Sequence, residues 1–155
     1  MPTYSVRQAT EEDIPALVDF NCGIAAETED KQLDRELVTR GVTRALQQGE
    51  EAVYFVAVTK GDEANAAIAS LMLTREWSDW RDGWMAWIQS VYVHQHHRGN
   101  GIFKLLLQHA TAELKKNPDV RGLRLYVEND NTRAQSVYHN NGFIDPHYKM
   151  LEKMF

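Results

Sequence analysis

The sequence predicts a mixed α/β fold in which helices pack against a largely antiparallel sheet. Segments with apolar residues at helical spacing alternate with short runs rich in branched and aromatic residues. A hairpin signal, Arg81-Asp82-Gly83, lies between long strand-like runs, which indicates an antiparallel meander at the centre. Because the chain has 155 residues and neither a linker nor an internal repeat, we expect a single domain, residues 1–155.

The amino-terminal part is typical of one strand followed by two helices. Residues 4–7 form the expected strand. The next segment, TEEDIPALVDFNCGIAAETED, has apolar residues at helical spacing and two candidate capping residues, Thr10 and Asp13. A second helix is expected over residues 33–48, and Gly49 supplies its stop.

Strand-like runs fill the middle of the chain. The run AVYFVAV, residues 52–58, is apolar without alternation, as in a strand covered on both faces. A polar turn at 60–63 separates it from the run AAIASLMLTREW, residues 66–77, and the run at 84–93 follows the hairpin signal.

The remaining segments continue the alternation of helix and strand. We expect a helix over 102–116, a strand over 122–128, a short helix over 131–140 that ends before Gly142, and a last strand over 148–155. The predicted order is therefore β, α, α, three strands, α, β, α, β.

Composition narrows the possible partners and location. The net charge of −5 is spread over interspersed acidic and basic residues, so no nucleic-acid-binding face is expected. No secretory signal and no bilayer-spanning run is visible, so we expect a cytoplasmic protein without membrane contact. The single cysteine, Cys22, is interpreted as a small buried apolar residue.

The junction HQHHRGNGIF, residues 94–103, is the most informative stretch. A strand that enters a glycine-rich turn and then a helix points main-chain N–H groups and the positive end of the helix dipole at one place. Gly99 and Gly101 would let an anion approach the main chain, and Arg98 could add a charge. The alternative is an ordinary glycine turn with a solvated arginine.

Two nucleotide motifs and a metal site are disfavoured at this junction. Ile102 and Phe103 stand where a phosphate-binding P-loop needs lysine and serine or threonine, and Lys104 replaces the third glycine of a dinucleotide fingerprint. The histidines at 94, 96 and 97 lack one-face spacing and a completing cysteine or carboxylate, so we expect no metal. A metal-binding module is kept only as a third reading.

Two motifs together resemble those of the GNAT superfamily of N-acetyltransferases. The run His96-His97-Arg98-Gly99-Asn100-Gly101 is similar to the acetyl-CoA signature Gln/Arg-x-x-Gly-x-Gly/Ala, with histidine in the first position. The run NDNTRAQSVYHNNGF matches Asn-x-x-Ala-x-x-x-Tyr-x-x-x-Gly-Phe, with Asn131, Ala134, Tyr138, Gly142 and Phe143 in place. The resemblance implies a GNAT fold, a mixed, mostly antiparallel, twisted sheet of about six to seven strands with about four flanking helices.

The resemblance also implies where acetyl-CoA would bind. In this family the strand before the turn splays from the next strand, and pantetheine lies in the gap against free main-chain groups. The residues assigned to acetyl-CoA are Val91, Tyr92, Val93, His96, His97, Arg98, Gly99, Asn100, Gly101, Ile102, Phe103, Asn131 and Tyr138.

The reaction implied is direct attack of a neutral amine on the acetyl carbon, without an acyl-enzyme. Tyr138 is the family-matched candidate to protonate the departing thiolate, although plain core packing is the alternative reading of this side chain. The usual glutamate of the fourth strand is missing, because that region reads Trp87-Ile88-Gln89-Ser90. Another carboxylate or a water chain must then act as base.

Carboxylates and tryptophans suggest the acceptor. Aromatic faces and anions together attract an ammonium group, so a small amine is expected. The candidate acceptor-side residues are Glu27, Glu29, Glu76, Asp79, Trp84, Trp87 and Gln89. Exposed carboxylates are more often merely solvated, and strand tryptophans often fill a core or a dimer interface, so a homodimer is left open.

The sequence therefore predicts an acetyl-CoA-dependent N-acetyltransferase that acts on a primary amine of a small molecule. One alternative is an enzyme whose acceptor is a protein or peptide amine. The other is a non-catalytic module that binds acyl-CoA as a sensor.

Overall fold

The computed structural model describes residues 3–155. By internal contacts the chain divides into two units, one that runs to Leu125 and one from Tyr126 to Phe155. Each unit is described by itself below. None of the helices within residues 3–155 is both long enough and apolar enough to cross a bilayer.

The larger unit is built on a five-stranded sheet in the order β1-β2-β3-β4-β5. The first three pairings are antiparallel and the pairing of β4 with β5 is parallel, which confirms the mixed, mostly antiparallel sheet. The strands are β1 (Tyr4–Gln8), β2 (Ala52–Thr59), β3 (Ala67–Ser78), β4 (Gly83–Val93) and β5 (Val120–Leu125).

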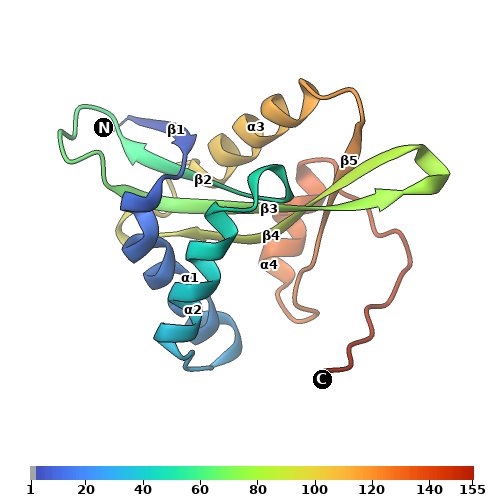
Figure 1. Ribbon diagram of the computed structural model, residues 1–155, viewed down its shortest axis with the longest axis horizontal. Helices are drawn as coiled ribbons and strands as arrows, with labels where there is room; N and C mark the ends of the chain where they lie inside the picture. Colours follow the sequence, from blue (N-terminus) through green and yellow to red (C-terminus); the bar gives the residue numbers. More distant parts are fainter. Residues whose placement is uncertain (1–2) are drawn as a thin grey trace. The chain divides into compact units, whose positions relative to one another are not determined.

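Helices cover both faces of this sheet. Figure 1 shows α1 (Ile14–Glu29) and α2 (Arg35–Leu46) on one face and α3 (Ile102–Lys115) on the other. The core under α1 and α2 joins Leu17, Val42 and Val56. Because β2 lies between the two helix layers, its central residues are buried on both faces, as the unbroken apolar run predicts.

An ion pair fixes the start of α1 to β1. The guanidinium of Arg7 donates to both carboxylate oxygens of Asp13, at 2.7 and 2.9 Å, and the main-chain N–H of Thr10 donates to Asp13 at 2.8 Å. Burial alone would raise the pKa of Asp13, but these hydrogen bonds and the charge of Arg7 outweigh it and lower the pKa. Thr10 and Asp13 thus stand at the helix start, where the sequence places them.

The β3–β4 hairpin extends beyond the end of β2. Pairing of β3 with β2 ends at Thr74, whereas its pairing with β4 continues to Ser78. Asp82 takes the left-handed conformation at the turn, with φ of 47°. Gly83 follows, and a Cβ there would lie 2.4 Å from the carbonyl oxygen of Asp119, so the close approach of these segments requires glycine.

The smaller unit contains one helix, α4 (Thr132–Asn140). The side chain of Asn131 accepts a hydrogen bond from the N–H of Ala134 at 3.1 Å and caps this helix. Gly142 ends the helical segment with φ of 89°, and the ring of Phe143 packs edge-on against that of Tyr138 at 5.7 Å. Burial raises the pKa of the Tyr138 phenol.

The prediction of a last strand over 148–155 is wrong in this structure. The segment forms no strand, so the sheet built by residues 3–155 has five strands and not the six to seven expected. Apolar residues are frequent in this segment, but such a composition specifies only a preference, and a strand exists only with a partner for its main-chain groups. The strand expected over 122–128 lies two residues earlier and ends at Leu125.

Candidate active site

An opening between β4 and β5 is the central feature of the site. The two strands pair from Trp84 to Ile88 on β4, and the last partner on β5 is Leu125. Beyond this point β4 continues to Val93 and, among residues 3–155, pairs with β3 alone. Because β5 ends at Leu125, the edge of residues 89–93 that faces away from β3 has no neighbouring strand among the described residues.

A bulge in β4 marks the start of this opening. Ile88 faces Leu73 across the sheet and Ser90 faces Met72, so Gln89 is an extra residue without a partner on β3. Such a bulge increases the local twist and bends a strand away from its neighbour. Gln89 is exposed there, at the mouth of the opening.

Main-chain groups of two valines point into the opening. The N–H of His94 donates to the carbonyl of Ile68 on the β3 side at 2.9 Å. In an antiparallel pair such groups alternate, so Val91 and Val93 direct their N–H and C=O groups away from β3. The carbonyl of Val93 accepts from Nε of Arg98 at 2.9 Å.

The turn after β4 presents a concave main chain at the start of α3. Gly99 and Gly101 have φ of 80° and 74°, and a Cβ at either position would meet nothing within 4 Å. The first hydrogen bond of α3 runs from the N–H of Leu105 to the carbonyl of Gly101, so the N–H groups of Ile102 and Phe103 face the turn. Positive φ and open space suit a bound phosphate group.

The side chains of His94 and His97 contact the turn and β1. Nδ1 of His94 accepts from the N–H of His96 at 3.4 Å, and His97 contacts the hydroxyl of Tyr4 on β1 at 3.2 Å. The side chain of Asn100 donates to the carbonyl of His97 at 2.9 Å. Among the described residues no group of three histidine, cysteine, aspartate or glutamate side chains is arranged to hold a metal.

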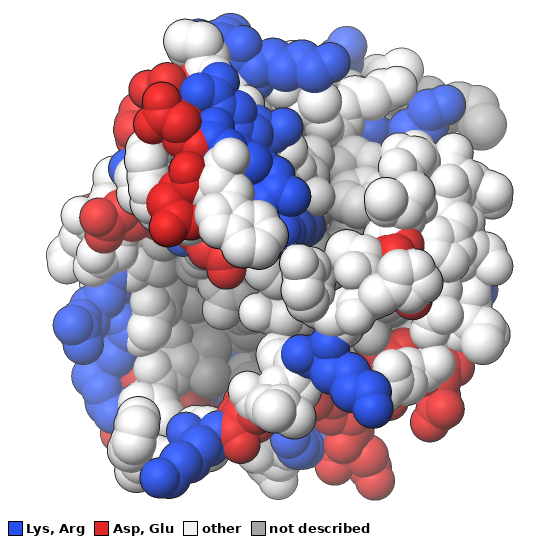
Figure 2. Space-filling model, turned by 90° about the vertical axis from the view of Figure 1, so that its right-hand side faces the viewer, with Lys and Arg blue, Asp and Glu red and all other residues white. Residues whose placement is uncertain are grey.

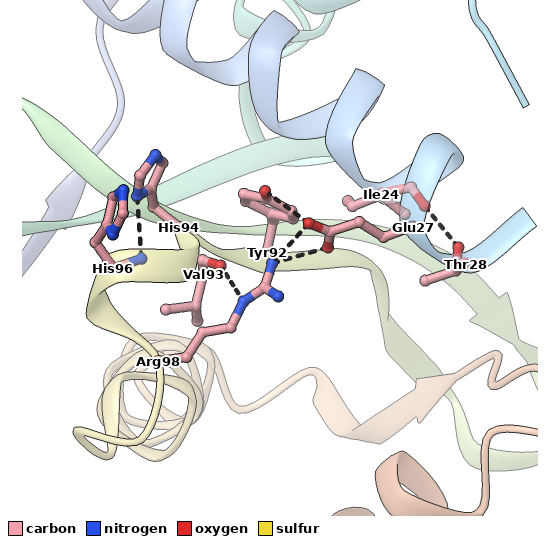
Figure 3. A network of polar contacts seen from close by, with 8 residues as sticks. All are labelled: Ile24, Glu27, Thr28, Tyr92, Val93, His94, His96 and Arg98. Atoms are coloured by element: carbon pink, nitrogen blue, oxygen red, sulfur yellow. Dashed lines mark hydrogen bonds and ion pairs between the residues drawn. The ribbon is translucent and has the colours of Figure 1, made fainter. Parts of the chain in front are cut away.

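Arg98 is turned back from the glycine turn toward α1. Its Nη2 donates to both carboxylate oxygens of Glu27, at 3.0 and 2.8 Å, while Nε holds the carbonyl of Val93 (Figure 3). The guanidinium also lies 5.4 Å from the ring centre of Tyr92. Its charge is therefore already paired with a carboxylate in this structure.

Tyr92 packs β4 against α1. Its ring stacks on Phe20 at 5.3 Å, its hydroxyl donates to Glu27 at 3.3 Å, and a Cβ on Gly23 would come within 2.9 Å of that hydroxyl. Burial, and next the negative charge of Glu27, raise the pKa of the Tyr92 phenol. A glycine within a helix was the one sequence signal of this close approach, since helix interiors disfavour glycine.

The hairpin residues expected on the acceptor side lie at the other end of β4. Trp84 and Val91 are seven positions apart, which corresponds to about 23 Å of strand. Arg75 stacks over Trp84 at 4.1 Å, and Glu76 is paired with Arg124. These groups thus already have partners within the sheet, and the structure does not bring them to the opening.

The other acceptor candidates are dispersed. Glu29 forms a loose ion pair with Lys31 at 3.8 Å, and Asp79 lies in the hairpin turn. Trp87 is half-buried opposite Thr74, in register with Arg124 on β5. Of the carboxylates proposed from the sequence, Glu27 is the one that the structure brings to the glycine turn, through its ion pair with Arg98.

Two surface features bear on possible ligands. A hollow of about 570 Å³ lies at the loop between α1 and α2, lined by Cys22, Ala26, Asp30, Lys31, Gln32, Leu33 and Arg35. It contains none of the residues of the glycine turn.

On the face drawn in Figure 2, acidic and basic side chains are interspersed, and no strip of one sign is visible there.

Comparison with known proteins assigns this architecture. The chain matches the acetyltransferase (GNAT) family over residues 19–143. A possible acetyltransferase from Clostridium difficile 630 is 35% identical, with 98% of this chain and 97% of that chain covered and a TM-score of 0.89. No curated protein sequence is significantly similar to the chain.

More distant solved structures share the fold. A putative acetyl transferase from Pyrococcus furiosus is 21% identical over 98% of this chain and all (100%) of that chain, with a TM-score of 0.75. The aminoglycoside N-acetyltransferase AAC(6')-Iy, solved in complex with CoA, is 15% identical over 99% and 96% of the chains, with a TM-score of 0.78. Because the family match covers most of the chain, residues 19–143, this chain belongs to the GNAT family of acetyltransferases.

Proposed function

We propose that this chain transfers an acetyl group from acetyl-CoA to a primary amine of a small molecule. The observation that carries the proposal is the opening between β4 and β5, which leads directly into the glycine turn at the start of α3. A single continuous surface can thus accept an extended thioester arm at one end and a diphosphate at the other.

The diphosphate would bind to main-chain donors. Gly99 and Gly101 leave space for it, and the first N–H groups of α3 add the positive end of the helix dipole. Arg98 would contribute mainly by holding the turn, because Glu27 already compensates its charge.

The thioester arm would lie along β4. The main-chain groups of Val91 can pair with amide groups of the arm, and an N–H in this row can stabilise negative charge on the thioester oxygen. Loss of one such donor costs about 3 kcal/mol of barrier at comparable sites. Acetyl-CoA supplies the activated acetyl group, while the chain supplies alignment and these donors.

Proton transfer would involve Tyr138 and water. Since burial raises its pKa, the Tyr138 phenol stays protonated at neutral pH and can donate to the departing thiolate. Glu27 is paired with Arg98 and β4 carries no carboxylate, so we assign removal of the amine proton to water at the mouth of the opening.

The test is release of free thiol from acetyl-CoA against a panel of small amines, aminoglycosides, amino acids and peptides. Aminoglycosides are included because an aminoglycoside N-acetyltransferase has the same fold. Tyr138→Phe is assayed in parallel, with binding of acetyl-CoA followed by thermal shift. We expect a small-amine substrate, and a large loss of kcat in the variant with little change in acetyl-CoA affinity.

The other outcomes decide between the alternatives. Turnover with peptides alone would replace the small-molecule acceptor by a protein amine. Binding of acetyl-CoA without turnover on any acceptor would favour the sensor. Unchanged kcat in Tyr138→Phe would remove the acid role of this residue.

A further inference from the structure

We propose that the hollow at the loop between α1 and α2 binds the carboxylate of the acceptor, so that the acceptor is an α-amino acid. Naming this molecule the acceptor rests on the acetyl transfer proposed above, whereas its binding in the hollow does not. The proposal narrows the small amine to one class of substrate.

The hollow has the size and the lining of a small-molecule site. Its volume of about 570 Å³ lies within the range of ligand pockets, roughly 300–1,000 Å³. A molecule that combines an apolar part with charges of both signs fits the lining. The apolar lining comes from Cys22, Ala26 and Leu33, and the charged lining comes from Asp30, Lys31 and Arg35.

Two helix ends hold the loop around the hollow in place. Asp30 ends α1 in the left-handed conformation, with φ of 51°, and the N–H groups of Asp30 and Lys31 donate to the carbonyl of Ala25. The carboxylate of Asp34 accepts from two N–H groups in the first turn of α2, at 3.0 and 3.2 Å, and caps that helix. The loop is therefore held at both ends before any ligand binds, which lowers the cost of binding.

Two cations of the lining can hold a carboxylate. Nη2 of Arg35 donates to Asp19 at 2.6 Å, but a guanidinium has five N–H donors, so this contact leaves donors for a ligand. The ammonium of Lys31 lies 3.8 Å from Glu29, which is a loose ion pair. Both cationic side chains are more than half exposed, so neither has to leave a buried partner. A carboxylate between them would gain two charge-assisted contacts.

Asp30 supplies the opposite charge. It stands at the C-terminal end of α1, where the carbonyl groups add the negative end of the helix dipole. An ammonium group is attracted to such a place. An α-amino acid carries both charges close together, and the apolar lining can receive its side chain.

The hollow and the opening flank the same end of α1. Ala26 lines the hollow, and the next residue, Glu27, reaches Arg98 at the opening between β4 and β5 (Figure 3). Neighbouring residues of an α-helix point about 100° apart, so the hollow and the opening lie on adjacent sides of α1. A molecule whose carboxylate is held in the hollow can thus present an amine toward the opening.

The first test uses Cys22, the only cysteine of the chain, as a reporter inside the hollow. Its alkylation by iodoacetamide is followed by mass spectrometry without acetyl-CoA. Each standard amino acid except cysteine is added at millimolar concentration and compared with the matching amine that lacks the carboxylate, such as lysine with cadaverine and histidine with histamine.

We expect at least one amino acid to slow the alkylation about fivefold or more, because only the unoccupied hollow reacts. Its matching amine should have little effect. Equal protection by the acid and the amine, or protection by no amino acid, would overturn the proposal.

Matched variants separate the two cations from the structure of the loop. Arg35→Gln and Lys31→Gln should each weaken the protection about fivefold or more, because each removes a charged contact to the carboxylate. Asp19→Asn also breaks the ion pair of Arg35 but keeps the guanidinium, so protection should persist. Lys60→Gln, at an exposed lysine in the turn after β2, is the control. Full protection in both Arg35→Gln and Lys31→Gln would contradict a carboxylate site between these side chains.

Turnover tests the role of the bound molecule. The amino acid that protects Cys22 should release thiol from acetyl-CoA, and Arg35→Gln should raise its KM about fivefold or more with the KM for acetyl-CoA unchanged. Turnover of other amines but not of this amino acid would leave the acetyl transfer intact and overturn the acceptor assignment. Protection without turnover of any amine would instead refute the acetyl transfer, and the acceptor assignment with it.

Discussion

Arg98 bridges two parts of the site, because its guanidinium binds the carboxylate of Glu27 on α1 and the carbonyl of Val93 on β4. The bridge ties the end of the first helix to the strand that borders the opening. A residue of the glycine motif thus acts here on the shape of the site, and the carboxylate of Glu27 is already paired with an arginine.

Glu27→Gln and Arg98→Gln should therefore raise the KM for acetyl-CoA more than the KM for the acceptor. We expect the KM for acetyl-CoA to rise about two- to fivefold in either variant, since a partly exposed ion pair contributes about 0.2–1 kcal/mol. The double variant should be no worse than the more affected single variant, because both substitutions remove the same ion pair. Steady-state kinetics measures these values, and Glu29→Gln serves as the control. A higher KM for the acceptor alone in Glu27→Gln would instead place this carboxylate in the acceptor site.

Gly99 and Gly101 should tolerate alanine better than glutamate. At φ of 80° and 74° an alanine costs about 1–2 kcal/mol of stability, but its Cβ meets open space. Glutamate adds bulk and negative charge where the diphosphate would bind. Acetyl-CoA at one hundred times its Kd should stabilise the wild type by about 2.7 kcal/mol, and this effect should vanish in Gly99→Glu or Gly101→Glu. Thermal shift that stays unchanged in both would contradict a phosphate site at the turn.

Alanine at Gly23 and at Gly41 should have opposite effects on stability. Both glycines lie in helices, where alanine is normally favoured by up to about 1 kcal/mol. A Cβ at Gly41 meets nothing, whereas one at Gly23 comes within 2.9 Å of Tyr92. We expect Gly41→Ala to stabilise and Gly23→Ala to destabilise by about 1–3 kcal/mol, the usual cost of overpacking. Denaturant unfolding measures both, and a stabilising Gly23→Ala would show that Tyr92 moves freely.

The ion pair of Arg7 with Asp13 should make stability depend on pH. The pKa of Asp13 is lower in the folded protein than its ordinary value of 3.8. Its contribution is therefore present above that value and is lost as the pH falls through the folded pKa. Asp13→Asn should lower the free energy of unfolding by about 3 kcal/mol at neutral pH, because it leaves a partly buried arginine without its counter-ion.

Unfolding curves at pH 7 and pH 3 would check this dependence. The difference in free energy of unfolding between wild type and Asp13→Asn should be smaller at pH 3 than at pH 7. The control is Asp19→Asn, whose pair with Arg35 is exposed on both sides and should contribute less than about 1 kcal/mol. Equal losses in the two variants would contradict the special role of Asp13.

The sequence by itself determined the elements and the position of the turn. Helical periodicity, unbroken apolar runs and the glycines at 99 and 101 are local properties, and each leads to a local structure with little help from the rest of the chain. For this reason the helices, the antiparallel centre and the junction after β4 agree with prediction, apart from boundaries that shift by a few residues.

Only the tertiary structure decided which groups meet. Glu27 and Arg98 are 71 positions apart, and no local pattern relates them. Likewise, the early end of β5 opens the sheet beside Val91 and Val93, and the segment 148–155 has strand character without a strand. Pairing depends on where a second segment lies in space, and packing of the whole chain sets that position.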